Sequence, residues 1–368
     1  MVGLRAPWGT EGGVETVVGK LAPRLVERGC EVTVYCRKRY NALGPGEHHG
    51  VKLVDIGTVY TRSLEALVHT GLAIPLATRD ADLVHIHAMG PALWSWVPRL
   101  RKTATVVSIH GMDWQRDKWG RAARWALQAG EWSATNFANE IITVGDHLNT
   151  NLKRRHGRSS TVIPNGVDPI EYVAIEESGI SDISSGQFAL FLGRLVPEKG
   201  LDRLISVWNR VGGDMPLLIV GGSTHMDVYQ NELKEKAGPS IRFMGPLYGR
   251  QRDALLTHAR ALVLPSHLEG LPLAPLEAMA ASTPVWLSDI PPHHEILDAT
   301  IIDRAGRIVA DDQWETEIAR LCTMSTTDLD AMGKAGSAHV RKHYSWSTIA
   351  DKTLEIYRAA ILGQTEVI

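Results

Sequence analysis

The sequence predicts an α/β protein with two domains, each built around a doubly wound parallel sheet, and three observations support this prediction. The chain has 368 residues, more than a single hydrophobic core usually holds, so two domains are expected. Short apolar runs alternate with stretches of helical periodicity in both halves, which is the rhythm of βαβ units. Between the halves, residues 162–168 are rich in turn formers and residues 173–187 show no clear period, as expected of a connection between domains.

The first half opens abruptly. Met1–Leu4 is too short for an ordinary first strand, so either this strand is a stub or residues are missing before it. The loop that follows ends in Gly12 and Gly13, and apolar residues then recur with helical spacing as far as Val26, although Pro23 should cost this helix a hydrogen bond. The strands expected after this helix are Val32–Cys36, Val51–Asp55, Leu83–His87, Val106–His110 and Ile141–Val144.

The second half repeats the same rhythm. Its expected strands are Phe188–Leu192, Leu217–Val220, Ala261–Pro265 and Val285–Ser288, with the segment Ile241–Leu247 after the second of them. Helices are expected from Leu201, over Leu273–Ala281 and over Ser347–Leu362.

The composition argues against several classes of protein. A hydrophobic content of 44%, a charged content of 22% and a net charge of −2 are ordinary for a soluble globular protein and argue against nucleic-acid binding. Three scattered cysteines without a CxxC pair suit a reducing cytosol and argue against a structural zinc site. No apolar run approaches the ~20 residues of a membrane span, and no signal peptide is recognisable. We therefore expect a cytoplasmic protein.

The most informative stretch follows the strand Ala261–Pro265. A loop carrying Glu269 leads from this strand into a helix that starts at Leu273 and carries Glu277 about one turn inside. Open α/β sheets bind ligands beyond the carboxyl ends of their strands, and the amides of a helix N-terminus attract phosphate. The two carboxylates can thus flank one ligand without both facing its phosphates. The alternative is an ordinary βα turn with one solvated glutamate and one on a helix face.

Glu269 and Glu277, with seven residues between them inside EGLPLAPLEAMA, resemble the E-x7-E signature of retaining glycosyltransferases of family 4, which have the GT-B fold. The segments GGVET from Gly12, IPNGVD from Ile163 and GRLVPEKG from Gly193 agree with the same family. The resemblance implies two Rossmann-like domains that face one another across a cleft. Residues 1–168 would form the acceptor-side domain, with the C-terminal helix 347–368 packing back onto it, and residues 169–346 would bind the nucleotide-sugar.

The resemblance also implies roles for individual residues. Arg194 and Lys199 lie at a strand end and in its loop, where two cations suit a diphosphate, although surface cations on a loop are the alternative. Glu277 would accept hydrogen bonds from the ribose, and Glu269 and His110 would lie beside the sugar. The implied catalytic residues are His110, Glu269, Arg194 and Lys199. The implied nucleotide-sugar-binding residues are Gly12, Gly13, Arg194, Lys199, Gly245, Leu247, Glu269, Leu273, Ala274 and Glu277.

Neither a metal nor a cofactor is expected, because GT-B enzymes generally need no bound cation. We interpret His85 and His87, which end a strand, as a packed or capping pair rather than a metal site.

Tryptophans and basic residues are interleaved in the first half. The tryptophans are Trp94, Trp96, Trp114, Trp119, Trp125 and Trp132, and the basic residues between 99 and 158 are Arg99, Arg101, Lys102, Arg116, Lys118, Arg121, Arg124, Lys153, Arg154, Arg155 and Arg158. Such a surface could rest on the inner face of an anionic membrane, which would suit a lipid-linked acceptor. A solvated helix face with buried indoles is the alternative.

The implied activity is a retaining transfer of a sugar from a nucleotide-diphosphate donor, most commonly a UDP-sugar in this family, to a hydroxyl of a carbohydrate or lipid-linked acceptor, as in the synthesis of polysaccharide precursors. One alternative is a nucleotide-sugar epimerase on the same fold, which would need no acceptor. The other is a catalytically silent binding protein, which the short first strand favours and the joint presence of Arg194, Lys199, Glu269 and Glu277 opposes.

Overall fold

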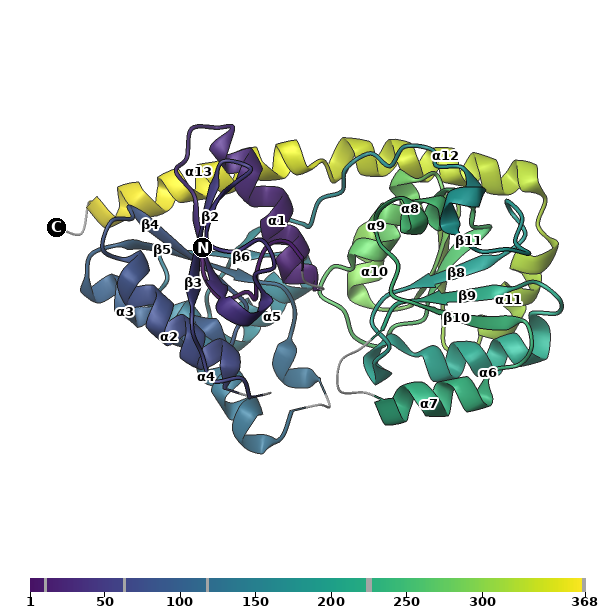
Figure 1. Ribbon diagram of the computed structural model, residues 1–368, viewed down its shortest axis with the longest axis horizontal. Coiled ribbons are helices and arrows are strands. Elements are labelled where there is room, and N and C mark those ends of the chain that lie inside the picture. Colours follow the sequence, from purple (N-terminus) through teal and green to yellow (C-terminus); the bar gives the residue numbers. More distant parts are fainter. Residues whose placement is uncertain (10–11, 62–63, 117–118, 223–226, 366–368) are drawn as a thin grey trace. The chain divides into compact units, whose positions relative to one another are not determined.

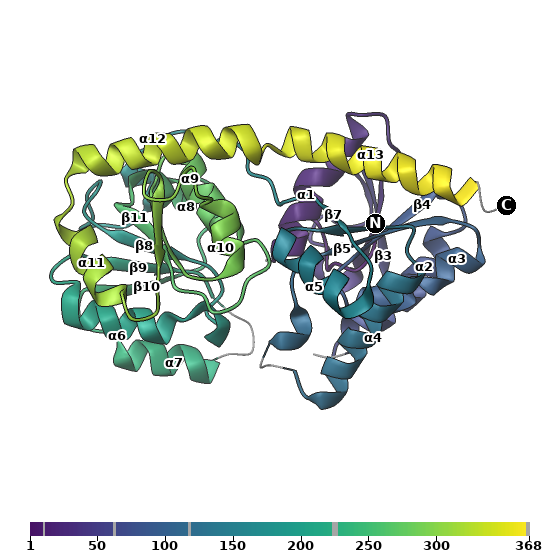
Figure 2. The ribbon, with the colours of Figure 1, turned by 180° about the vertical axis from the view of Figure 1, so that it is seen from behind.

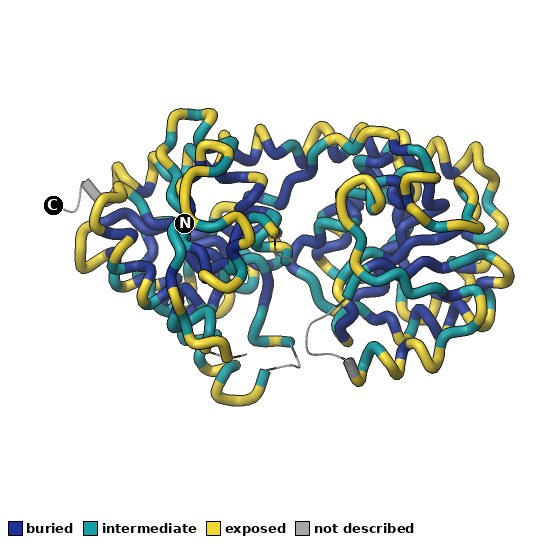
Figure 3. The backbone as a smooth tube through the Cα atoms, viewed as in Figure 1, coloured by how far each residue is buried: buried dark blue, intermediate teal, exposed yellow. Residues whose placement is uncertain are grey.

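The computed structural model describes residues 1–9, 12–61, 64–116, 119–222 and 227–365, and the chain divides into two compact units (Figure 1). Unit 1 consists of Met1–Gly166 and Trp346–Ile368, and unit 2 consists of Val167–Ser345. Each unit is an α/β layer structure in which most strands are buried (Figure 3). Of the basic residues named above, Lys118 lies outside the described residues.

Unit 1 contains two sheets. A three-stranded sheet has the order β1-β3-β2, with β1 (Thr33–Arg37) parallel to β3 (Val51–Ile56) and β2 (Gly46–His48) antiparallel to it. A parallel four-stranded sheet has the order β4-β5-β6-β7, and its strands are Leu83–His87, Ala104–Ile109, Glu140–Thr143 and Thr161–Val162.

The chain's first residues join these two sheets. The Val2 amide donates to the His85 carbonyl at 3.0 Å, and the His87 amide donates to the Val2 carbonyl at 3.0 Å. On the other side, the Tyr35 amide donates to the Met1 carbonyl at 3.0 Å. The segment therefore pairs with β4 and β1 in the manner of a strand, although only Val2 forms a ladder bridge, to Ile86. The described segment is as short as the sequence indicated.

The helices of unit 1 lie on both sides of the four-stranded sheet (Figure 1). They are α1 (Gly13–Val26), α2 (Glu65–Ala77), α3 (Trp96–Leu100), α4 (Arg121–Phe137), α5 (Asp146–His156) and α13 (Trp346–Thr365), with 3₁₀ turns at η1 (Lys38–Tyr40), η2 (Pro91–Trp94) and η3 (Asp113–Gln115). Helix α13 packs on α1 and on strands β4 to β6. Helix α1 continues through Pro23, as the sequence predicted.

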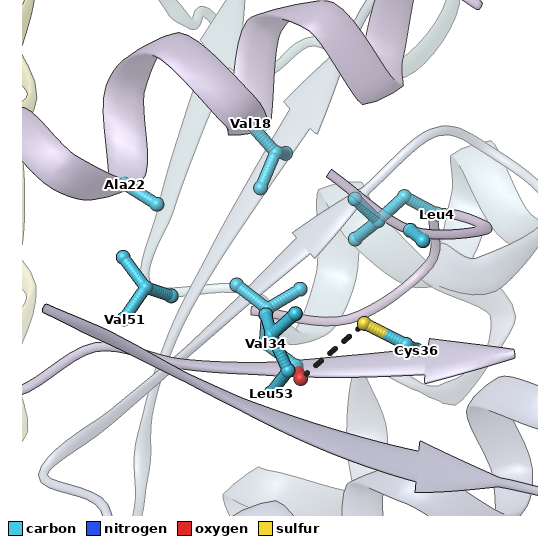
Figure 4. Close-up of a cluster of buried hydrophobic side chains, with 8 residues drawn as sticks. Leu4, Val18, Ala22, Val34, Cys36, Val51 and Leu53 are labelled. Atoms are coloured by element: carbon cyan, nitrogen blue, oxygen red, sulfur yellow. Dashed lines mark hydrogen bonds between the residues drawn. The ribbon is translucent and has the colours of Figure 1, made fainter. Parts of the chain in front are cut away.

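One hydrophobic core cluster of unit 1 lies between α1 and the three-stranded sheet. Val18 and Ala22 of α1 face Val34 of β1 and Leu53 of β3, and Leu4 of the first segment closes one end of the cluster (Figure 4). Each aliphatic side chain that is fully withdrawn from water contributes about 1.5–3 kcal/mol. The apolar residues whose spacing predicted α1 therefore form the face of the helix that packs on the sheet.

Unit 2 contains one parallel six-stranded sheet with the order β10-β9-β8-β11-β12-β13. Its strands are β8 (Ala189–Leu192), β9 (Leu217–Val220), β10 (Ile241–Gly245), β11 (Ala261–Leu264), β12 (Val285–Ser288) and β13 (Gly306–Val309). From β8 the chain builds outward first through β9 and β10 and then, on the other side, through β11 to β13. The sheet is thus doubly wound, and its strand order reverses between β8 and β11.

Helices cover both faces of this sheet, with α8, α9 and α12 on one side and α6, α7 and α11 on the other (Figures 1 and 2). The helices are α6 (Leu201–Val211), α7 (Asp227–Lys236), α8 (Gly249–His258), α9 (Leu273–Ala280), α10 (Pro291–Ile296), α11 (Trp314–Thr323) and α12 (Thr326–His343), with 3₁₀ turns η4 (Ile175–Ser178) and η5 (Pro197–Lys199). Trp208, Trp286 and Trp314 are fully buried in this unit. The predicted α/β fold, with parallel sheets in both halves, is confirmed.

Candidate functional site

The candidate site lies in unit 2, at the carboxyl ends of β8 and β11. These two strands are neighbours in the sheet, and the strand order reverses between them. Loops that leave the sheet at such a point diverge to opposite faces and leave a place for a ligand. The loop after β8 carries Arg194 and Lys199, and the loop after β11 carries Glu269.

A glycine allows these two loops to approach closely. Gly200 has a φ of 66°, in the left-handed region, and a Cβ atom at this position would lie 2.2 Å from the carbonyl oxygen of Pro265. Two residues away on each loop, the His267 amide donates to the Glu198 carbonyl at 2.9 Å. Lys199 lies between these two contacts, so its backbone is fixed against the loop that follows β11.

Lys199 and Glu269 form an ion pair. The Lys199 Nζ lies 2.5 Å from the Glu269 Oε1, and the two side chains are only 14% and 10% exposed. The same oxygen accepts a hydrogen bond from the Ser266 hydroxyl at 2.7 Å. Burial alone would raise the pKa of the Glu269 carboxyl, but the Lys199 charge and the hydrogen bonds from Lys199 and Ser266 together hold the pKa below its usual value. Glu269 is therefore a buried carboxylate that stays charged.

The hydrogen-bond network extends to a histidine that sequence reasoning missed. The Ser288 hydroxyl donates to the Ser266 carbonyl, and the Nδ1 of His293 lies 2.8 Å from the Ser288 carbonyl. A carbonyl oxygen only accepts hydrogen bonds, so Nδ1 carries the proton and Nε2 of the neutral ring is a bare lone pair. His293 is completely buried, and its Nε2 has no hydrogen-bond partner among the described residues. Burial lowers the pKa of His293 to about 4, and the Lys199 charge acts in the same direction.

The position of His293 just after a predicted strand is the signal that could have identified it from the sequence. It follows β12, which is the next strand beyond β11 in the sheet, so its loop ends at the same edge as Glu269.

The second predicted carboxylate has a different partner. Glu277 lies on α9, and its Oε1 is 3.0 Å from the Nη1 of Arg252 on α8. Sequence reasoning also missed Arg252. Leu273 and Ala274 are the first two residues of α9, and the N-cap residue before them, Pro272, makes no side-chain hydrogen bond to the helix. The N-terminal amides of α9 therefore have no side-chain cap from that residue, which leaves them suited to an anion.

The remaining predicted residues of unit 2 lie along the same edge. Arg194 is exposed and follows β8 by two residues. Gly245 ends β10, and its carbonyl accepts a hydrogen bond from the Gly221 amide at 2.8 Å, so the loops after β9 and β10 are joined. Leu247 lies two residues after Gly245 and is partly buried.

His110 lies in unit 1, just after β5, and belongs to a cluster of imidazoles in which His85 and His87 are buried and His110 is partly buried. Its Nε2 is 3.1 Å from the Nδ1 of His87, whose ring packs against that of His85 with 4.0 Å between the centroids. His85 in turn bonds to Tyr357 at 2.6 Å and to Ser108 at 2.7 Å. Burial lowers the pKa of His110 to about 4, so the ring is neutral near pH 7. The prediction that His85 and His87 pack together is confirmed.

Gly12 and Gly13 also lie in unit 1, at the start of α1. Gly12 has a φ of 155°, a conformation that side chains rarely adopt, and a Cβ atom here would lie 2.0 Å from Glu15. Among the described residues, nothing lies within 4 Å of a Cβ position at Gly13.

The structure thus groups the predicted residues by unit. Arg194, Lys199, Glu269, Glu277 and the start of α9 lie on adjacent loops and one helix of unit 2, whereas His110, Gly12 and Gly13 belong to unit 1. Within the part of the chain that the structure describes, no group of three or more His, Cys, Asp or Glu residues is placed to hold a metal ion.

Comparison with known proteins assigns both halves of the chain. The family model described as Glycosyltransferase Family 4 matches residues 11–171, and the one described as Glycosyl transferases group 1 matches residues 176–335. D-inositol 3-phosphate glycosyltransferase from Segniliparus rotundus is 32% identical over 405 residues, which cover 97% of this chain and 88% of that protein.

Two solved structures show the same fold over nearly the whole chain. Sucrose-phosphate synthase from Thermosynechococcus elongatus superposes with a TM-score of 0.80 at 20% identity, covering 96% of this chain and 94% of that one. Anabaena HepE in complex with UDP-glucose superposes with a TM-score of 0.79 at 16% identity, covering 95% and 97%.

Proposed function

The chain belongs to the family 4 glycosyltransferases, which are transferases with the GT-B fold, and from this premise we propose that it moves a sugar from a nucleoside-diphosphate donor to a hydroxyl acceptor with retention of configuration. The proposed donor is a UDP-sugar. Its support is the resemblance to a family in which uracil is the commonest base, together with the UDP-glucose complex of the structurally similar HepE.

The observation that carries the proposal is the arrangement around Lys199. A buried ammonium, the exposed Arg194 five residues earlier and the N-terminus of α9 lie at the carboxyl ends of β8 and β11, where the strand order reverses. Arg, Lys and helix amides are the groups that proteins use to bind phosphate. We assign the diphosphate to this place, and we assign the ribose hydroxyls to Glu277.

Cleavage of the sugar–phosphate bond leaves a diphosphate whose negative charge grows as the bond breaks. Cations fixed beforehand at that charge stabilise the transition state more than the ground state. A double displacement would need a carboxylate free to attack the opposite face of the sugar. Glu269 is paired with Lys199, and Glu277 is paired with Arg252. We therefore propose that the acceptor attacks from the face that the diphosphate leaves, and that the departing phosphate takes the acceptor's proton.

We assign the contact with the transferred sugar to His110. The hydrogen bond to His87 uses the Nε2 of His110, so Nδ1 is the ring nitrogen that would meet a sugar hydroxyl. A neutral ring suits this task, because a hydroxyl group both donates and accepts hydrogen bonds.

The first test is a thermal-shift panel of UDP, GDP, ADP and their sugar conjugates, because a ligand that binds only the native state raises the melting temperature. We expect UDP and one UDP-sugar to give the largest shifts. Transfer is then measured with carbohydrate and lipid-linked acceptors, and the anomeric configuration of the product is read by NMR. Conversion of the donor without an acceptor would identify an epimerase instead, and an inverted product would refute the mechanism.

We also propose that unit 1 contacts an anionic membrane from the cytoplasmic side. Trp125 and Trp132 of α4 are 72% and 52% exposed, and Arg121 and Arg124 lie on the same helix. Trp94 and Trp114 are instead partly buried, and their indoles donate hydrogen bonds to the Leu67 carbonyl at 2.9 Å and to Glu131 at 2.8 Å. The exposed indoles of α4 support the membrane interpretation of the tryptophan-rich stretch, and the hydrogen-bonded indoles support the alternative of a packed helix face. No helix in the described ranges is long and apolar enough to span a bilayer.

The membrane contact is tested by sedimentation with vesicles that contain phosphatidylglycerol, at low and at high salt. We expect binding that salt weakens and that Trp125→Glu abolishes. Equal recovery of the protein in the supernatant with and without anionic vesicles would refute the contact.

A further inference from the structure

We propose that His293 is a positioning residue that takes up a proton when the diphosphate binds, and that its imidazolium then replaces Lys199 as the partner of Glu269. This inference rests on the proposed function, because it takes Lys199 to be the cation that the diphosphate recruits. The chemical step is a single protonation. The Nε2 lone pair of His293 forms an N–H bond with a proton from the buffer, and no other bond changes.

The structure provides an unused buried acceptor on a histidine that hydrogen bonds link, through two serines, to the ion pair. His293 is fully buried, its Nδ1 proton is committed to the Ser288 carbonyl at 2.8 Å, and its Nε2 has no hydrogen-bond partner among the residues described. A buried polar atom without a partner is uncommon and calls for an explanation. The ring is connected to Glu269 through two serines, since Ser288 donates to the Ser266 carbonyl and the Ser266 hydroxyl donates to Glu269 at 2.7 Å.

The charges around the ring are arranged for an exchange of partners. Glu269 and Lys199 act on His293 from the loops after β11 and β8, and on its own helix His294 acts on it while paired with Asp289 at 2.6 Å. With Lys199 held on Glu269 at 2.5 Å, the pair is neutral and a proton on His293 is unfavourable. When Lys199 turns to a diphosphate, Glu269 keeps one hydrogen bond and a buried negative charge. A buried carboxylate that loses its cation is strongly unfavourable, and a proton on the neighbouring imidazole removes that penalty.

Burial and the Lys199 charge both lower the pKa of His293, and Glu269 raises it. Withdrawal of Lys199 removes one lowering influence and strengthens the raising one, so the pKa rises on binding. Linkage then requires proton uptake at any pH between the free and the bound value, and tighter binding as the pH falls.

Titration calorimetry with UDP in buffers of different ionisation enthalpy measures this uptake directly. The matched pair of proteins is wild type and His293→Asn, because the Asn amide keeps the donor to Ser288 and lacks the second ring nitrogen. We expect the wild type to take up roughly one proton more per bound UDP than the variant at pH 6.5. The ionisation of UDP itself is common to both proteins and cancels. His294→Asn, on the exposed side of the same helix, is the control and keeps the wild-type uptake.

The same event has a spectroscopic signature that needs no variant. In wild-type protein with ¹⁵N-labelled histidine, the His293 Nε2 resonance should move on addition of UDP from the position of a bare nitrogen toward that of a protonated one. Equal proton uptake by wild type and His293→Asn, or an Nε2 that stays bare in the UDP complex, overturns the inference and leaves the proposed function intact. A protein that binds neither UDP nor any other nucleoside diphosphate overturns the proposed function itself.

Discussion

Replacing Lys199 with Met tests the ion pair at the centre of the candidate site without any assay of catalysis. The substitution keeps most of the side-chain volume and removes the charge, so Glu269 is left with the hydrogen bond from Ser266 and a side chain that is 10% exposed. Removing one partner of a buried pair typically costs about 3–5 kcal/mol. The Glu269 carboxyl can avoid the cost of an unpaired charge by taking up a proton, and protonating a carboxyl of ordinary pKa costs about 4 kcal/mol at pH 7. We therefore expect a loss of roughly 3–4 kcal/mol of unfolding free energy.

Because the carboxyl can be protonated, the loss of unfolding free energy depends on pH in a defined direction. In the wild type the folded-state pKa of Glu269 is lowered, so its contribution to stability is present above the unfolded pKa and is lost as the pH falls. In Lys199→Met, the free-energy cost of protonating the Glu269 carboxyl falls by about 1.4 kcal/mol for each unit by which the pH is lowered. The difference between the two proteins should thus shrink to about 1 kcal/mol near pH 5. Scanning calorimetry measures this stability difference, which at pH 7 corresponds to a melting-temperature shift of roughly 10 °C for a unit of this size.

The double variant Lys199→Met with Glu269→Gln separates folding from function. It removes both charges, so most of the lost stability should return. Turnover should not return, because the cation proposed to stabilise the leaving diphosphate is still absent, and a loss of about 10²–10³-fold is expected. A single variant that loses less than about 1 kcal/mol at pH 7, or a double variant no more stable than the single one, would refute the buried ion pair.

Three further predictions concern the other site residues. Arg194→Ala should lower turnover by about 10²–10³-fold in a steady-state assay, and wild-type turnover would place this cation away from the diphosphate. Glu277→Ala should mainly weaken UDP binding, seen by calorimetry as a higher dissociation constant with little change in the turnover number. Acid should destabilise the protein between about pH 6.5 and 4, because the folded-state pKa of His110 and of His293 is about 4 whereas unfolded histidine titrates near 6.5, so the unfolded state binds more protons in this window. A melting temperature that stays constant from pH 6.5 to 4.5 would contradict this last prediction.

Most parallel strands of both units could be predicted from the sequence because they are short and largely apolar, whereas β7 (Thr161–Val162) and β13 (Gly306–Val309) were not among the predicted strands. The strand Leu83–His87 has the predicted bounds, and Leu217–Val220 does too. The antiparallel strand β2 (Gly46–His48) could not be predicted, because its residues are mostly exposed and it is held by pairing with β3. The division of unit 1 into two sheets also had no local signal in the sequence. It depends on how the first five residues pair with strands β1 and β4, which lie further along the chain.

At the candidate site, the residue types could be predicted but their partners could not. Lys199 and Glu269 are 70 residues apart, and their contact depends on the close approach that Gly200 allows. Arg252 and His293 have no motif of their own; they become significant only because the sheet order brings the ends of their elements to one edge. Interactions between loops of different strands are set by tertiary packing, and a single sequence carries no direct record of them.

The pairing of Lys199 with Glu269 has a consequence for how an anion site of this kind works. In the absence of ligand Glu269 is the ion-pair partner of Lys199, so it would compete with the proposed diphosphate for the same cation. If the carboxylate that loses this competition is compensated by a proton on His293 when the ligand arrives, the site avoids an uncompensated charge both with and without ligand. Removing the acceptor nitrogen of His293 should therefore weaken UDP binding, even though this nitrogen is proposed to interact with Glu269 rather than with the nucleotide.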